Sequence, residues 1–181
     1  MNGYILALLI IIGIAIVIAL VYTTIYNRIQ SNTIRIHAAE SEIDEALRNK
    51  YDILKSMETI INENTEVKIN NFEELEKKNV KISNFDMDRK LTKISDTCNK
   101  ISSDYTQDLD IDNFKELTLK LKINEEKIVA SKTYYNQYTT RLNLLIKKFP
   151  SNIIARMHRI NTRMYFDNKN MEDNDILDFK Y

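Results

Sequence analysis

The chain has 181 residues, with 26 Lys or Arg and 26 Asp or Glu, so its formal net charge is zero. That balance argues against a nucleic-acid binder, which needs a basic excess to displace phosphate counterions. The single cysteine, Cys98, excludes an intrachain disulfide framework. Outside one apolar segment, the length allows one modest domain.

The first element is an uncharged apolar run over residues 5–21, ILALLIIIGIAIVIALV. Such a run is long enough to cross a hydrocarbon core of about 30 Å as a helix. A signal peptide is the alternative, but no basic side chain precedes the run and no small-residue cleavage site follows it. We therefore predict a short tail at residues 1–4 and a retained transmembrane helix at residues 5–26. The expected membrane-interface residues are Tyr4, Tyr22, Tyr26 and Arg28.

The orientation of this span depends on few charges. Arg28 and Arg35 follow it, whereas only the terminal amine precedes it. The positive-inside tendency favours a cytoplasmic C-terminal domain, and an extracytoplasmic domain stays open. The sequence thus predicts a single-pass protein of the cell membrane, with the lipid bilayer as its first partner.

Glycine and proline are nearly absent beyond the span, since Gly13 is the last glycine and Pro150 the only proline. Without these residues, which most often mark turns, long helices are expected. From Phe114 to Phe149 the apolar residues step by three and four in a heptad seam, interrupted by Asn124 and Ser131. A second seam runs over residues 22–60, so one helix is expected to continue from the bilayer into the domain.

A third seam begins near Asn71, where Asn71-x-x-Glu74 has the form of a capping box. Its phase slips before Met87, which predicts a kink, a bulge or a short break at residues 83–86. The seam then continues to Tyr105.

Two loops are predicted from clusters of polar residues, at residues 62–70 and 106–112. Asn113-x-x-Glu116 is expected to cap the helix after the second loop. A short last helix is expected at residues 152–166.

These elements predict an all-α protein, in which the N-terminal transmembrane helix is followed by an antiparallel up-and-down bundle of three long helices plus a short C-terminal helix. The bundle domain takes in residues 27–166. The acidic segment at residues 167–181 is expected to be a mobile tail or to dock only through its few apolar residues.

The stretch at residues 131–155, SKTYYNQYTTRLNLLIKKFPSNIIA, resembles the C-terminal signature of the LemA family. The matching residues are Tyr134, Tyr135, Asn136, Asn143, Phe149, Pro150, Ser151 and Asn152. The chain departs from the family pattern at Glu40, Lys55 and Thr106, where the family usually has tryptophan, proline and proline. The resemblance implies a bacterial membrane protein with one transmembrane helix and a helical-bundle domain whose biochemical activity is not established.

No residue set in the sequence has the form of a catalytic, cofactor or metal site. Asp108-x-Asp110-x-Asp112 resembles half a calcium loop, but asparagine and leucine stand where the loop needs glycine and glutamate. His37 and His158 have no second ligand at metal-binding spacing. Phosphate loops need glycines that the chain lacks after its span. We therefore expect no enzyme and no cofactor.

A stripe on the last long helix is the candidate interaction site. We call it the tyrosine–asparagine stripe, and its residues are Tyr134, Tyr135, Asn136, Tyr138 and Asn143. Buried asparagines commonly make internal hydrogen bonds, whereas exposed tyrosines commonly anchor a partner, and the sequence leaves both interpretations open. Tyr134, Leu144 and Ile146 lie off the main seam, so self-association is also open.

Two functions of different class follow from the sequence. The first is a non-catalytic scaffold or adaptor for other membrane or envelope proteins. The second is a regulator of envelope stress or membrane state that uses residues 83–86 as a bistable joint. Deleting Asn84 would restore the seam and separate the two.

Overall fold

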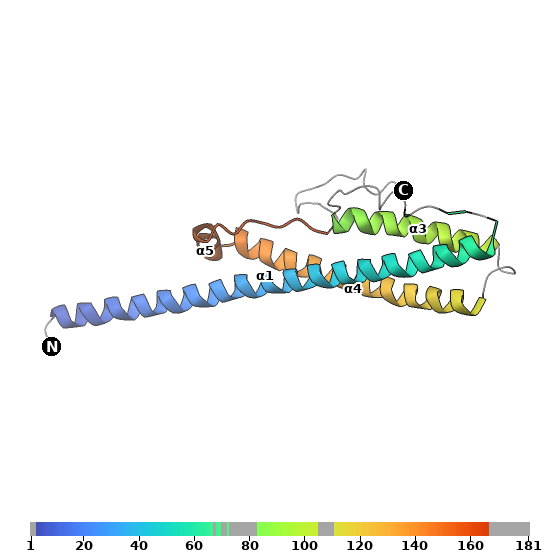
Figure 1. Ribbon diagram of the computed structural model, residues 1–181. Helices are drawn as coiled ribbons and strands as arrows, with labels where there is room; N and C mark the ends of the chain where they lie inside the picture. The colour runs from blue at the N-terminus through green and yellow to red at the C-terminus, as the bar shows by residue number, and fades with distance from the viewer. Residues whose placement is uncertain (1–2, 67, 70–71, 73–82, 105–110, 167–181) are drawn as a thin grey trace. The chain divides into compact units, whose positions relative to one another are not determined.

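A computed structural model describes residues 3–66, 68–69, 72, 83–104 and 111–166 of the protein. Four helices hold nearly all of these residues (Figure 1). They are α1 (Gly3–Asn64), α3 (Asn84–Asp104), α4 (Ile111–Lys147) and α5 (Ser151–Met157). The predicted all-α class, with three long helices and a short last one, is confirmed.

Helix α1 is a single element of 62 residues, as the continuous seam predicted. Every side chain from Ile5 to Val21 is exposed, and no other described helix lies alongside this part of α1 (Figure 1). Helix α1 is therefore a helix that is long enough and apolar enough to cross a membrane. Beyond it, α1 contributes buried side chains from Ile29 to Ile61. Near its end Leu54 and Ile61 are buried, whereas the predicted seam residues Ile53 and Ile60 are only half-buried.

The chain divides into two compact units. Unit 1 contains residues 1–38, 135–165 and 169–181, and unit 2 contains residues 39–134 and 166–168. Helices α1 and α4 therefore contribute to both units, whereas α3 belongs to unit 2 and α5 to unit 1.

Contacts within unit 2 give the helix directions. Helices α1 and α4 are antiparallel. Asn124 of α4 contacts Ala46 of α1, whereas Ser131, later in α4, contacts Glu42, earlier in α1. Helices α3 and α4 are likewise antiparallel, since Ser95 meets Glu125 and Asp88 meets Lys132. The predicted antiparallel bundle is confirmed for both neighbours of α4, and α1 and α3 consequently point in the same direction.

Unit 1 has a small apolar core between α1, α4 and α5. Its buried members are Ile29, Ile36, Tyr138, Leu142, Ile154 and Ala155. The partly buried side chains packed against it are Tyr22, Ile25, Tyr26, Tyr135, Leu145, Ile146 and Ile160. Both seams contribute to this core in the phase that their heptads predicted.

The start of α3 lies within the predicted discontinuity. The Ser83 hydroxyl accepts a hydrogen bond from the Asp86 amide at 3.1 Å and donates one to the Asp86 carboxylate at 2.7 Å. This is the side-chain capping expected where a helix begins. Apart from Phe72, which is buried, the first half of the third seam, including the box at Asn71 and Glu74, lies outside the described residues, as do Tyr105, Thr106 and the tail at 167–181.

Three predicted boundaries were wrong, two of them by only a few residues. Asn62 belongs to α1 and does not open a loop, and Asn113 lies in the first turn of α4 and does not precede it. Several Asp and Asn residues stand in succession before Phe114, and each has a side chain suited to an N-cap, so the pattern did not select one.

The third correction is at the last helix, which was predicted to reach residue 166 but ends at Met157. Arg159 has a φ of 53°, and the Ile160 amide bonds back to the Ala155 carbonyl at 2.9 Å. This left-handed turn closes the helix in the manner of a Schellman motif. Glycine is the usual residue in that position, and its absence from the sequence hid the stop.

Candidate functional site

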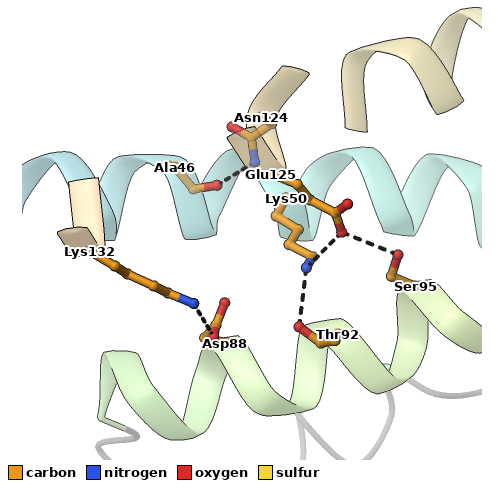
Figure 2. Close-up of polar contacts among 8 residues, drawn as sticks. All are labelled: Ala46, Lys50, Asp88, Thr92, Ser95, Asn124, Glu125 and Lys132. Carbon is orange, nitrogen blue, oxygen red and sulfur yellow. Dashed lines mark hydrogen bonds and ion pairs between the residues drawn. The ribbon is translucent and has the colours of Figure 1, made fainter. Parts of the chain in front are cut away.

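A buried lysine is the centre of a polar network in unit 2 (Figure 2). Lys50 on α1 is only 3% exposed, and its ammonium lies 2.9 Å from the Glu125 carboxylate on α4. The same ammonium donates to the Thr92 hydroxyl at 3.3 Å, and the Ser95 hydroxyl donates to Glu125 at 3.4 Å. One ion pair with two hydroxyl partners thus joins α1, α3 and α4, the helices that the structure describes in this unit.

The two polar interruptions of the α4 seam also bind α1. The Asn124 amide donates to the Ala46 carbonyl at 2.8 Å, and the Ser131 hydroxyl donates to Glu42 at 3.3 Å. Buried polar groups of this kind fix the register between helices, because any other alignment leaves them without partners.

Charged pairs at the edge of the same helices add to this alignment. Lys127 pairs with Glu45 at 3.0 Å, and Lys132 donates to Asp88 (Figure 2). The Lys132 ammonium also lies 4.9 Å from the centre of the Phe166 ring. These contacts help to align α1, α3 and α4 within the unit.

Two side chains of unit 2 have shifted pKa values. Burial, together with a smaller effect of the nearby Glu58 carboxylate, raises the pKa of the Cys98 thiol to about 12. A thiol held protonated in this way is a poor nucleophile. On the exposed face of α4, a hydrogen bond from Lys120 lowers the pKa of the Glu116 carboxyl.

Two asparagines make the same unusual contact with the main chain. Asn143 donates to the Arg163 carbonyl and accepts from the Arg163 amide, both at 2.8 Å. Asn62 donates to the Ile69 carbonyl at 2.9 Å and accepts from the Ile69 amide at 2.7 Å. Each side chain replaces the pairing that a neighbouring strand would give, and we call these contacts asparagine clamps.

The structure divides the tyrosine–asparagine stripe between inward and outward positions. Asn143 and Tyr138 are buried, and the Tyr138 hydroxyl accepts a hydrogen bond from Arg35 at 2.9 Å. Tyr135 is half-buried and donates to the Met164 carbonyl at 3.1 Å, and Asn136 is also half-buried. Tyr134 is exposed. The stripe is therefore not one continuous surface.

The expected interface residues divide in a similar way. Tyr4 and Arg28 are exposed, whereas Tyr22 and Tyr26 are half-buried against His158. The Tyr22 hydroxyl lies 2.6 Å from the His158 Nε2, and the Tyr26 and His158 rings are 4.7 Å apart. The sequence did not reveal this contact, because the residues that it joins lie 136 positions apart.

Among the seam residues that the structure describes, Phe149 is the one that lies outside. The seam predicted it as the last inward side chain of α4, but it is 74% exposed because α4 ends two residues earlier, at Lys147. Ile146, which lay off the seam, instead packs against the core of unit 1, and Leu144 is exposed.

His37 and the acidic residues form no metal site in the part of the chain that the structure describes. The His37 Nε2 accepts a hydrogen bond from the Arg163 guanidinium at 2.9 Å. No group of three or more His, Cys, Asp or Glu side chains gathers among the described residues. Asp108 and Asp110 lie outside them.

Sequence reasoning missed the buried ion pair of Lys50 and the contact that Asn143 makes with the Arg163 main chain. Lys50 stood in the predicted seam as a charged residue among apolar ones, and that position alone signals a buried cation in need of a carboxylate. The clamp on Arg163 gave no comparable signal, since any residue can supply a backbone amide and carbonyl.

The fold and these contacts define a helical-bundle protein. It has an exposed apolar helical end and a few buried polar side chains that align its helices. The model of the LemA family matches residues 39–179, which is most of the chain, and the protein belongs to that family. The LemA family is not a known enzyme family. Neither a curated protein nor a solved structure matches the chain.

Proposed function

We propose that the protein is a single-pass, membrane-anchored scaffold that holds other membrane or envelope proteins and carries out no catalysis. The observation that supports this most directly is α1, whose first part is exposed and apolar and whose later part supplies the buried seam of both units. One helix thereby joins a membrane-compatible segment to the bundle. Buried polar side chains of unit 2, such as Lys50 and Asn124, make contacts that align helices, which suits a structural role.

Membrane anchoring is tested by cysteine labelling in intact cells. In a Cys98→Ser background, Gly3→Cys and Glu63→Cys place thiols on the two sides of the proposed span, and both positions have room for the side chain. A membrane-impermeant thiol reagent is expected to label one position and not the other. Labelling of both, or of neither until lysis, contradicts a single span. Protection of Glu63→Cys places the bundle in the cytoplasm, as Arg28 and Arg35 suggest.

The scaffold role is tested by site-specific photo-crosslinking at the outward part of the stripe. A photoreactive residue replaces Tyr134, and a matched variant carries it at Leu119, which is also exposed on α4 in unit 2. A discrete adduct with another protein from Tyr134 but not from Leu119 supports the role. Adducts formed only between copies of this chain would instead support self-association.

A regulator with a joint at residues 83–86 is the second candidate. The capping of Asp86 by Ser83 supports a real helix boundary there. Deleting Asn84 is expected to hold such a protein in one state. An unchanged response to membrane or envelope stress would contradict the joint.

A further inference from the structure

The end of unit 1 that contains α5 exposes large apolar side chains. We call residues 147–159 the α5 tip. Ile154 and Ala155 face the core of unit 1, whereas Ile153 and Met157, one turn apart, are 52% and 65% exposed. Phe149, in the turn before α5, is 74% exposed. Side chains of this size in one short segment mark an interaction surface.

Among the described residues of unit 1, the charge around this apolar face has one sign. The described residues of unit 1 contain no Asp or Glu, because the sequence has none before Glu40 and none between Glu126 and Asp167. Their basic residues are Arg28, Arg35, Arg141, Lys147, Lys148, Arg156, Arg159 and Arg163. The four that belong to the α5 tip are all exposed. Although the chain as a whole has zero net charge, the charged side chains among the described residues of unit 1 are all basic.

The α5 tip lies where the apolar run of α1 ends. His158, next to α5, is held by Tyr22, and Tyr22 directly follows the last residue of that run. Figure 1 shows α5 beside this part of α1. If the run crosses the bilayer, the residues that follow it stand in the headgroup layer.

We propose that the α5 tip docks on the surface of an anionic bilayer, with Phe149, Ile153 and Met157 inserted among the headgroups and the surrounding cations bound to lipid phosphates. Apolar side chains combined with Lys and Arg are the pattern of interfacial segments. A second copy that presented its own α5 tip would fit this surface poorly, because that tip carries the same sign of charge. The inference rests on the membrane anchor proposed above.

The absence of tryptophan from the chain allows a direct test in the full-length protein. Phe149→Trp reports on the tip, Leu9→Trp on the span, and Ile123→Trp on an exposed position of unit 2. Each variant is reconstituted in phosphatidylcholine vesicles with brominated acyl chains, with and without phosphatidylglycerol. The tip reporter is expected to shift to the blue and to be quenched when the anionic lipid is present, and the Ile123→Trp reporter is not.

The charges are tested in the Phe149→Trp background by replacing Lys147, Lys148, Arg156 and Arg159 with Gln. Each cation near an anionic surface contributes about 1 kcal/mol, so each replacement is expected to weaken docking roughly fivefold. The matched control replaces four exposed lysines of unit 2, namely Lys93, Lys100, Lys115 and Lys122, and should leave quenching unchanged.

An unquenched tip reporter overturns the proposal. Leu9→Trp then tells the two ideas apart, since its quenching shows that the anchor stands without the docking, and its lack of quenching shows that the anchor fails as well. Quenching of the tip that is equal with and without phosphatidylglycerol also overturns an anionic-lipid site. Circular dichroism of every variant confirms that the helices are retained.

Discussion

The side-chain amide of Asn143 on α4 pairs with both backbone groups of Arg163, at 2.8 Å for each hydrogen bond. Asn143 is only 3% exposed, so each atom of this amide depends on that single partner. Tyr135 and Thr140, on the same helix, bind Met164 and Tyr165. The extended segment after α5 is consequently held to α4 by three side chains, and the clamp is its buried centre.

Replacing Asn143 with Asp is expected to release this segment. The carboxylate keeps the bond from the Arg163 amide but turns the other contact into a repulsion between two oxygens. Loss of a buried donor costs about 2 kcal/mol. Hydrogen exchange should accelerate over residues 160–165. Asn62→Asp is the matched control, since it breaks the clamp on Ile69 and should leave the exchange of residues 160–165 unchanged.

The Lys50–Glu125 pair predicts an asymmetry between its two partners. Glu125→Ala leaves a cation that is 3% exposed without its carboxylate, and we expect a loss of about 2 kcal/mol in the free energy of unfolding. Lys50→Met removes the charge and keeps the apolar stem, so its stability should stay within about 1 kcal/mol of the parent. Denaturant unfolding in detergent measures both. Equal losses would show that the pair acts as a surface contact.

The Cys98 thiol should make stability depend on pH in the alkaline range. Its folded pKa of about 12 lies above the ordinary value of 9.0, so the folded state holds the proton more tightly than the unfolded chain. This contribution is fully present below pH 9 and is lost as pH rises toward the folded value. Cys98→Ala should therefore flatten the fall in stability over that window. An identical pH slope in both proteins would place the thiol in contact with solvent.

Thr139 has a fully buried hydroxyl, and its Oγ1 has no hydrogen-bond partner within the described part of the chain. Thr139→Val removes this unsatisfied oxygen and keeps the shape, so we expect stabilisation by about 1 kcal/mol. The neighbouring Thr140 hydroxyl bonds to the Asn136 carbonyl and lies 3.1 Å from the Tyr165 hydroxyl. Thr140→Val should destabilise the protein, and thermal unfolding compares the two. A melting temperature lowered by both variants would indicate an unseen partner for Thr139.

The long helices could be predicted because their signals repeat over many residues. The heptad pattern places an apolar residue on the inward face again and again, for example at Ile29, Ile43 and Leu121. One polar interruption such as Asn124 therefore does not hide the helix. The family could be predicted from the FPSN stretch after α4 for a different reason, since that short segment has an uncommon order of residues.

Helix ends and the candidate site were harder to predict, because each depends on one contact. Asn113 has the chemistry of a cap, yet the helix begins two residues before it. Asn143 was recognised as important, but its partner is main chain at Arg163, which leaves no trace in side-chain identity. Phe149 has the heptad spacing of an inward residue, but it is exposed because α4 ends before it, at Lys147.

Arg159 occupies the left-handed turn that closes α5, with a φ of 53°. A side chain in this conformation costs about 1 kcal/mol, which glycine would avoid. If the α5 tip docks on lipid, Arg159→Gly has opposite effects on the stability of the fold and on membrane binding, because it relaxes the turn while it removes a cation. A variant selected for heat resistance in detergent would then lose its hold on the membrane, and one selected in membranes would keep the strained arginine.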